Sequence, residues 1–153
     1  MKIREMNVSC IEGFRVLSEE EMNQMNFING APDLCILDPE KHILMNFASS
    51  KGNILISAML SERDVARQTE KIIAQAIRES GFEFIDFVSE EISGREAEGF
   101  LYEYKADDID MAGKTLCLKK AKAFYFIYCY YRKALEKESL ETIRQVFDTI
   151  SWD

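Results

Sequence analysis

The sequence predicts an α/β protein in which helices cover both faces of a β-sheet. Residues 122–132, KAFYFIYCYYR, are apolar at almost every position. Because successive side chains of a strand point to opposite faces, a strand of this kind is apolar on both sides. Such a strand belongs in the middle of a sheet that is covered above and below. Two long segments with apolar residues at helical spacing, one after Ser61 and one after Glu136, supply the expected covers.

The N-terminal part predicts short strands and one short helix. Ser18 and Glu21 form a capping box, which starts a helix. An Asp-Pro turn at residues 38–41 joins two apolar runs. The expected elements are two strand-like pieces around Gly13 within residues 8–17, the capped helix, strands at 34–37 and 42–48, and a further strand at 53–60.

The remainder predicts a long helix, four strands and a final helix. Ser61 and Asp64 form a second capping pattern, and Gly81 is placed to end the helix that follows. The expected strands are residues 82–88, 97–106, 114–118 and 122–132, with a polar connection at 107–113 and a last helix at about 136–150. The 153 residues contain no repeat or linker, which favours a single domain over residues 1–153.

Charge and composition exclude several classes of function. The formal net charge is −8, which argues against general nucleic-acid binding and against docking on anionic lipids. No stretch has the apolar length of a signal peptide or a membrane helix, so we expect a cytoplasmic protein without membrane insertion. The four cysteines show no CxxC spacing, which favours free thiols, most of them buried, over a zinc site.

No catalytic or metal-binding motif is present. His42 is the only histidine, so an enzyme would need it beside a carboxylate or a thiol, and a surface histidine is the favoured interpretation. The acidic run at residues 107–113 resembles a calcium loop but lacks the last carboxylate, because Lys119 stands there. Paired carboxylates are expected to form a polar rim: Glu19 to Glu21, Glu90 with Glu91, and Glu96 with Glu98. We expect no cofactor and no metal.

The tyrosines have an uneven distribution, since all six lie between Tyr102 and Tyr131. Tyrosine places an apolar ring and a polar hydroxyl at the same site, which suits groove walls and protein interfaces. The candidate partner-binding residues are Tyr102, Tyr104, Tyr128 and Tyr130. The alternative, aromatic packing across strands inside the core, is the favoured interpretation.

Two segments carry a resemblance to a known fold. IEGFRVLSEEE (Ile11 to Glu21) and the aromatic strand, acidic helix and Ser-Trp ending of Ala123 to Asp153 resemble the start and the end of PsbP-like proteins. This resemblance implies an α+β fold with an antiparallel sheet of about seven strands and helices on both faces, a three-layer α/β/α sandwich. It implies no common enzyme. It implies protein binding, as in a Ran-binding nuclear import factor and in bacterial chaperones that shelter apolar helices of secreted effectors.

The leading hypothesis is therefore a non-catalytic protein-binding module of a bacterial cell, an adaptor or a dedicated chaperone, whose partner is another protein. Two alternatives remain: a carrier of a small apolar ligand between sheet and helix, and an enzyme of unknown class that uses His42. A homodimer is compatible with each of them.

Overall fold

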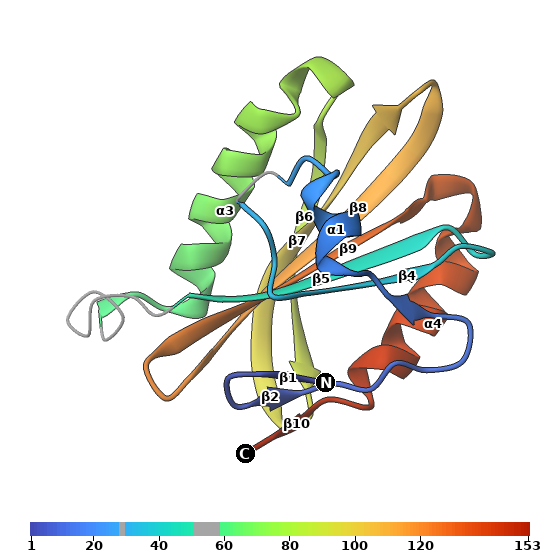
Figure 1. Ribbon diagram of the computed structural model, residues 1–153. Helices are drawn as coiled ribbons and strands as arrows, with labels where there is room; N and C mark the ends of the chain where they lie inside the picture. Colours follow the sequence, from blue (N-terminus) through green and yellow to red (C-terminus); the bar gives the residue numbers. More distant parts are fainter. Residues whose placement is uncertain (28–29, 51–58) are drawn as a thin grey trace.

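A seven-stranded antiparallel sheet forms the centre of the computed structural model, which describes residues 1–27, 30–50 and 59–153 (Figure 1). The strand order is β3-β4-β5-β9-β8-β7-β6. The α+β prediction of about seven antiparallel strands is confirmed. The strands are β3 (Arg15–Val16), β4 (Leu34–Asp38), β5 (Ile43–Ser50), β6 (Glu83–Ile92), β7 (Arg95–Ala106), β8 (Ile109–Lys120) and β9 (Ala123–Arg132).

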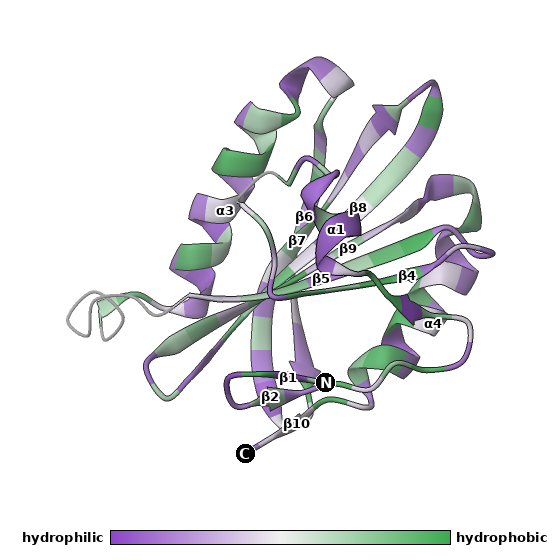
Figure 2. Cartoon of the chain, viewed as in Figure 1, coloured by the Kyte–Doolittle hydropathy of each residue, from purple (hydrophilic) through white to green (hydrophobic). Residues whose placement is uncertain are grey.

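Strand β9 is the fourth of the seven, as its two apolar faces predict. The helix α3 (Glu62–Ala76) covers one face of the sheet, and α4 (Glu136–Phe147) covers the other (Figure 1). Both helices alternate hydrophobic and hydrophilic segments, as amphipathic helices do (Figure 2). With one helix on each face of the sheet, the protein has three layers, as predicted.

The α4 face holds the larger core. Tyr125, Ile127 and Tyr131 of β9 are buried there with Ile143, Val146 and Phe147 of α4. A small three-stranded sheet closes this face, formed by β1 (Lys2–Ile3), β2 (Met6–Asn7) and β10 (Ser151–Trp152). It joins the two ends of the chain, because Trp152 lies opposite Met6.

The α3 face is covered less completely. Helix α3 packs on β7 and β8 through its buried residues Val65, Thr69 and Ile73. The short helix α1 (Glu19–Asn23) and the chain that follows it lie over the β4 and β5 side of the same face. Both predicted capping boxes are present, at Ser18 and at Ser61. Gly81 adopts the predicted left-handed conformation, with φ 75°.

Several predicted boundaries are wrong. The strand expected to begin at Val8 is instead β2, which ends at Asn7. The small three-stranded sheet was not predicted. The expected polar connection at 107–113 is a two-residue turn, Asp107–Asp108, followed directly by β8. Both aspartates have positive φ, as a tight hairpin requires, and aspartate tolerates that conformation. The last helix ends at Phe147, followed by a turn, Ile150 and β10. The strand predicted at 53–60 lies almost entirely outside the described residues.

Candidate functional site

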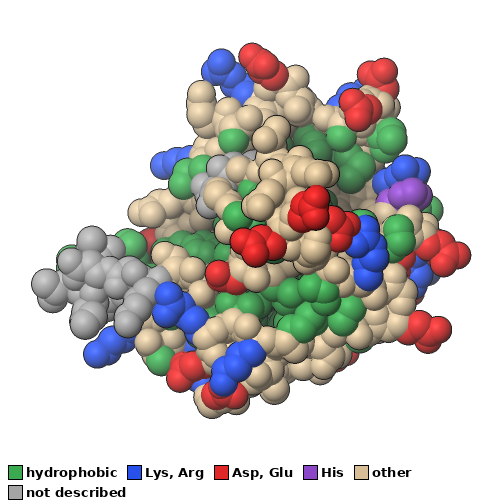
Figure 3. Space-filling model, in the orientation of Figure 1, with side chains coloured by type: hydrophobic (Ala, Val, Ile, Leu, Met, Phe, Trp, Pro, Cys, Tyr) green, Lys and Arg blue, Asp and Glu red, His purple; other side chains and the backbone are tan. Residues whose placement is uncertain are grey.

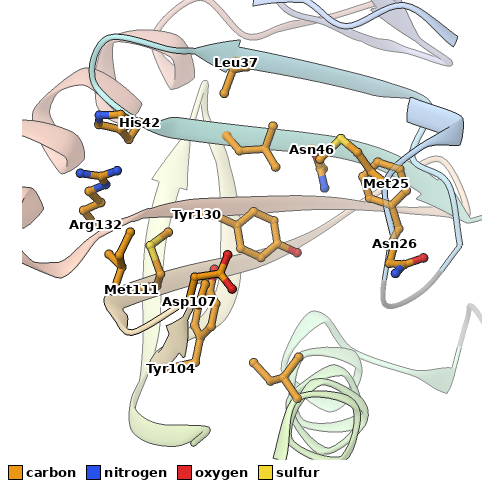
Figure 4. A pocket seen from close by; sticks show the side chains of 15 residues that line it. Met25, Asn26, Leu37, His42, Asn46, Tyr104, Asp107, Met111, Tyr130 and Arg132 are labelled. Carbon is orange, nitrogen blue, oxygen red and sulfur yellow. The ribbon is translucent and has the colours of Figure 1, made fainter. Parts of the chain in front are cut away.

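A pocket of about 490 Å³ lies on the α3 face, where α3 and α1 leave the sheet uncovered (Figure 4). This volume falls within the usual range of small-molecule sites, roughly 300–1,000 Å³. Most of the surrounding side chains are apolar or aromatic. The pocket is lined by Met25, Asn26, Phe27, Leu37, His42, Leu44, Asn46, Ile77, Tyr104, Ala106, Asp107, Ile109, Met111, Tyr130 and Arg132.

The register of the sheet places the floor of the pocket. Leu44 of β5 lies opposite Tyr130 of β9, so both side chains point to the same face. One step along that face, Arg132 lies opposite Met111 of β8, and Met111 lies opposite Tyr104 of β7. The strands β5, β9, β8 and β7 therefore form a continuous floor. Helix α1 and the end of α3 flank this floor.

Asn46 contributes a polar group to this floor. Its side chain is only 3% exposed and projects into the pocket (Figure 4). The thiol of Cys35 donates a hydrogen bond to Asn46 Oδ1 at 2.8 Å. Asn46 Nδ2 makes no hydrogen bond within residues 1–27, 30–50 and 59–153, and buried amide groups are normally paired. Among the described residues, this amide donor therefore faces the pocket without a partner.

The four predicted tyrosines lie on the same face of the sheet. Tyr104 and Tyr130 line the pocket. Tyr128 and Tyr130 line a smaller adjoining cavity of about 40 Å³. Tyr102 is fully buried beside them, so it cannot contact a partner directly. A partner-binding role for Tyr104, Tyr128 and Tyr130 stays a prediction.

Tyr102 belongs to an aromatic cluster beneath α3. Its ring stacks with Phe82 at a centroid distance of 5.3 Å and with Tyr104 at 5.7 Å. The ring also covers Gly113 of the neighbouring strand. The hydroxyl of Tyr102 is buried and has no hydrogen-bond partner in the described part of the chain. Cross-strand aromatic packing, the favoured interpretation from sequence, describes this residue correctly.

Burial keeps the pocket tyrosines protonated. It raises the pKa of Tyr104 to about 12 and raises the pKa of Tyr130 further above its ordinary value. The pKa of Tyr102 is raised for the same reason. At neutral pH these hydroxyls are hydrogen-bond donors and not bases. The hydroxyls of Tyr104 and Tyr130 have no hydrogen-bond partner among the described residues.

Two basic side chains stand at one end of the pocket (Figure 4). His42 was predicted to begin the strand at 42–48, but it lies in the preceding turn with φ 58°, and β5 begins at Ile43. His42 is exposed, as predicted for a surface histidine. Arg132 is half-buried and makes no ion pair or hydrogen bond within the described residues. Asp107, an exposed turn residue, also borders the pocket.

Other candidate chemistry is engaged elsewhere. Glu90 pairs with Lys114 at 2.7 Å, and Glu98 lies 3.8 Å from Arg63. Among the residues that the structure describes, no three His, Cys, Asp or Glu side chains could jointly hold a metal ion. All four cysteines are free; Cys35, Cys117 and Cys129 are buried and Cys10 is exposed. No helix within the described ranges is long and apolar enough to span a membrane.

Three exposed apolar residues of one strand were not predicted to be exposed. Phe84, Ile85 and Phe87 are 37%, 46% and 43% exposed, and all three lie on the edge strand β6. The register shifts between Phe84 and Asp86, a β-bulge that brings the rings of Phe84 and Phe87 to a centroid distance of 4.8 Å. The apolar pattern of this segment is like that of a buried strand. The exposure was missed because periodicity does not show which strand lies at the edge of a sheet.

Hydrophobic side chains also gather in hollows of the face seen in Figure 3, between projecting charged residues. Besides the clustered tyrosines, a sequence signal for the pocket is Asn46, a polar residue inside the apolar stretch from Ile43 to Phe47.

Comparison with known proteins supports the fold alone. No protein-family model matches the chain, and no curated protein matches its sequence. The solution structure of cyanobacterial PsbP (CyanoP) from Synechocystis sp. PCC 6803 matches with a TM-score of 0.65 and 9% identity, over 99% of this chain and 95% of that one. LpqN, which is involved in cell envelope biogenesis of Mycobacterium tuberculosis, matches with a TM-score of 0.53 and 13% identity, over 95% and 82% of the two chains. A Bacteroides thetaiotaomicron protein matches with a TM-score of 0.56 and 10% identity, over 97% of this chain and 48% of that one.

The chain therefore has a PsbP-like fold, as the two terminal segments indicate.

Proposed function

We propose that this protein is a non-enzymatic binding protein that holds a small, largely apolar molecule in the pocket between α1, α3 and the sheet. The observation that supports this most directly is the pocket itself, whose volume of about 490 Å³ and mostly apolar lining are those of a ligand site. Asn46, Tyr104 and Tyr130 carry donors with no partner among the described residues, and these donors would orient the ligand.

The arrangement favours binding over catalysis. His42 is exposed, and no carboxylate or thiol of the described residues pairs with it. The tyrosine hydroxyls remain protonated at neutral pH because burial raises the pKa of Tyr104 to about 12. A general base therefore has no candidate in the pocket apart from Asp107 and His42, which lie exposed at its border.

A neutral fluorescent probe tests the proposal. N-phenyl-1-naphthylamine, whose emission rises in apolar sites, is expected to bind the native protein with saturable affinity. Leu44→Trp fills the floor of the pocket and is expected to abolish the signal, whereas Leu135→Trp, outside the pocket lining, is the matched control. Equal binding to both variants, or no saturable binding to the native protein, would exclude the pocket as the site. Native mass spectrometry of freshly purified protein complements this, since a retained small molecule should appear as an added mass.

A second candidate function is protein binding through the edge strand β6. Its exposed Phe84 and Phe87 form an aromatic pair at an outer strand of the sheet, with Ile85 exposed between them in sequence, and such edges accept strands from other chains. Asp86 and Glu83 are exposed on the same strand, so the favoured partner segment is basic. Light scattering after size exclusion tests self-association at the same edge.

Substitutions distinguish ligand binding in the pocket from protein binding through β6. Phe84→Ser with Phe87→Ser is expected to remove a specific partner from co-purification and to leave probe binding unchanged. Leu44→Trp should have the reverse effect. Retention of the partner by the double variant would contradict the role of β6.

A further inference from the structure

We infer that the ligand of the pocket is an apolar carboxylic acid whose carboxylate binds Arg132. This inference rests on the proposed ligand-binding function and names the chemical class of the ligand. Its basis is a half-buried cation that has no partner among the described residues and lies at one end of a mostly apolar site.

Arg132 is unusual among the partly buried basic side chains. Lys114 pairs with Glu90 at 2.7 Å, and Arg95 donates to the carbonyl oxygen of Lys119 at 3.1 Å. Arg132 is half-buried too, yet the described residues offer its guanidinium neither an ion pair nor a hydrogen bond. A partly desolvated charge without a partner is costly. An anionic ligand would supply the ion-pair partner that the described residues do not.

The fold places this guanidinium at one end of the pocket, beside His42 (Figure 4). Arg132 lies on the same face of β9 as Tyr130 and opposite Met111. The register that sets Leu44 against Tyr130, continued two residues along that face, brings His42 beside Arg132. Figure 4 shows both side chains at the same end of the pocket. A planar guanidinium binds a carboxylate through two parallel hydrogen bonds, which makes it suited to this anion.

The rest of the lining fits the body of such a ligand. Met25, Leu44 and Met111 offer flexible apolar surface that accommodates a chain or a ring. Asp107 also borders the pocket but forms no ion pair with Arg132. The negative charge of Asp107, which lies near Tyr104, would repel an anion there and favours a carboxylate beside Arg132.

Calorimetric titration of the full chain with three ten-carbon compounds tests the inference. Decanoate carries the carboxylate, decanol is its neutral counterpart and decylamine carries the opposite charge. Decanoate is expected to bind at least about ten-fold more tightly than decanol, since a charge-assisted pair in a partly desolvated site contributes that much or more. Decylamine should bind most weakly. A parallel titration with 4-phenylbutyrate distinguishes an aliphatic from an aromatic acid.

Variants assign the effect to Arg132. Arg132→Gln is expected to remove the preference for decanoate over decanol and to leave decanol binding unchanged. Arg78→Gln, the same change at an exposed arginine outside the pocket lining, is the control for net charge. Because Arg132 is at the end of a strand and half-buried, the variant should fold, and its circular dichroism and melting temperature verify this.

The outcomes separate the two levels of the proposal. Equal binding of decanoate and decanol, or an unchanged preference in Arg132→Gln, overturns the inference and leaves the pocket as an apolar ligand site. Failure of all the compounds and of the neutral probe to bind overturns the proposed function itself.

Discussion

The ring of Tyr102 lies over Gly113, and a side chain at position 113 would occupy the same space. Tyr102 and Gly113 face each other across β7 and β8, and Tyr130 follows on the other side of Gly113. The missing side chain lets a buried aromatic ring lie flat against the sheet beside the pocket. Glycine is needed here for space, and its φ is not in the left-handed region.

Gly113→Ala should therefore destabilise the protein through overpacking, by about 1–3 kcal/mol. Urea unfolding followed by circular dichroism measures the change. A double-mutant cycle with Tyr102→Leu provides the control, because removal of the ring should recover a substantial part of the loss. Strictly additive effects of the two substitutions would show that the ring and the glycine do not interact.

Tyr102→Phe should leave stability unchanged or raise it by up to about 1 kcal/mol, because the buried hydroxyl has no partner among the described residues. Tyr125→Phe is the matched comparison. The hydroxyl of Tyr125 accepts a hydrogen bond from the backbone N–H of Glu5 at 3.2 Å, so its loss should cost about 0.5–1.5 kcal/mol. Thermal and urea unfolding should thus show Tyr125→Phe, and not Tyr102→Phe, as the destabilised variant. Equal destabilisation by both would mean that Tyr102 has an acceptor or donor partner after all.

Stability should fall at alkaline pH. Burial raises the pKa of Tyr104 from 10.0 to about 12, so the folded protein retains a proton that the unfolded chain releases above pH 10. The stabilisation is fully present below pH 10 and is lost as the pH rises through about 12. Urea midpoints at pH 9, 10 and 11 should decrease, and Tyr104→Phe should lessen the decrease. Titration of tyrosinate absorbance checks the same groups directly, with late-titrating residues expected among the buried tyrosines.

Trp152→Ala should destabilise the protein by about 2–3 kcal/mol, somewhat less than a fully buried aromatic residue, because Trp152 is half-buried. The indole packs edge-on against Tyr125 at a centroid distance of 5.1 Å, and the guanidinium of Arg95 lies 5.6 Å from its centre. Trp152→Phe keeps the aromatic contact and should lose clearly less. A small effect of Trp152→Ala in circular dichroism melts would show that β10 contributes little to the core.

The sequence alone predicted the central position of β9, both capping boxes and the covering helices. These features depend on local rules: alternation along a strand, three- and four-residue spacing in a helix, and side chains that bond the nearest backbone amides. Alternation also predicted that Tyr102 and Tyr104 share one face of β7 and that Tyr128 and Tyr130 share one face of β9. The register of β7, β8 and β9 then brings both pairs to the same face of the sheet.

Only the tertiary structure decided which of those residues are accessible. Whether Tyr102 is covered and Tyr130 is open depends on where α3 ends above the sheet, which no local pattern encodes. The small sheet depends on pairing Met6 with Trp152 across the length of the chain, and the exposure of Phe84 depends on β6 lying at an edge. The same is true of Arg132 and His42, which are 90 positions apart in sequence and share one end of a pocket because β5 pairs with β9.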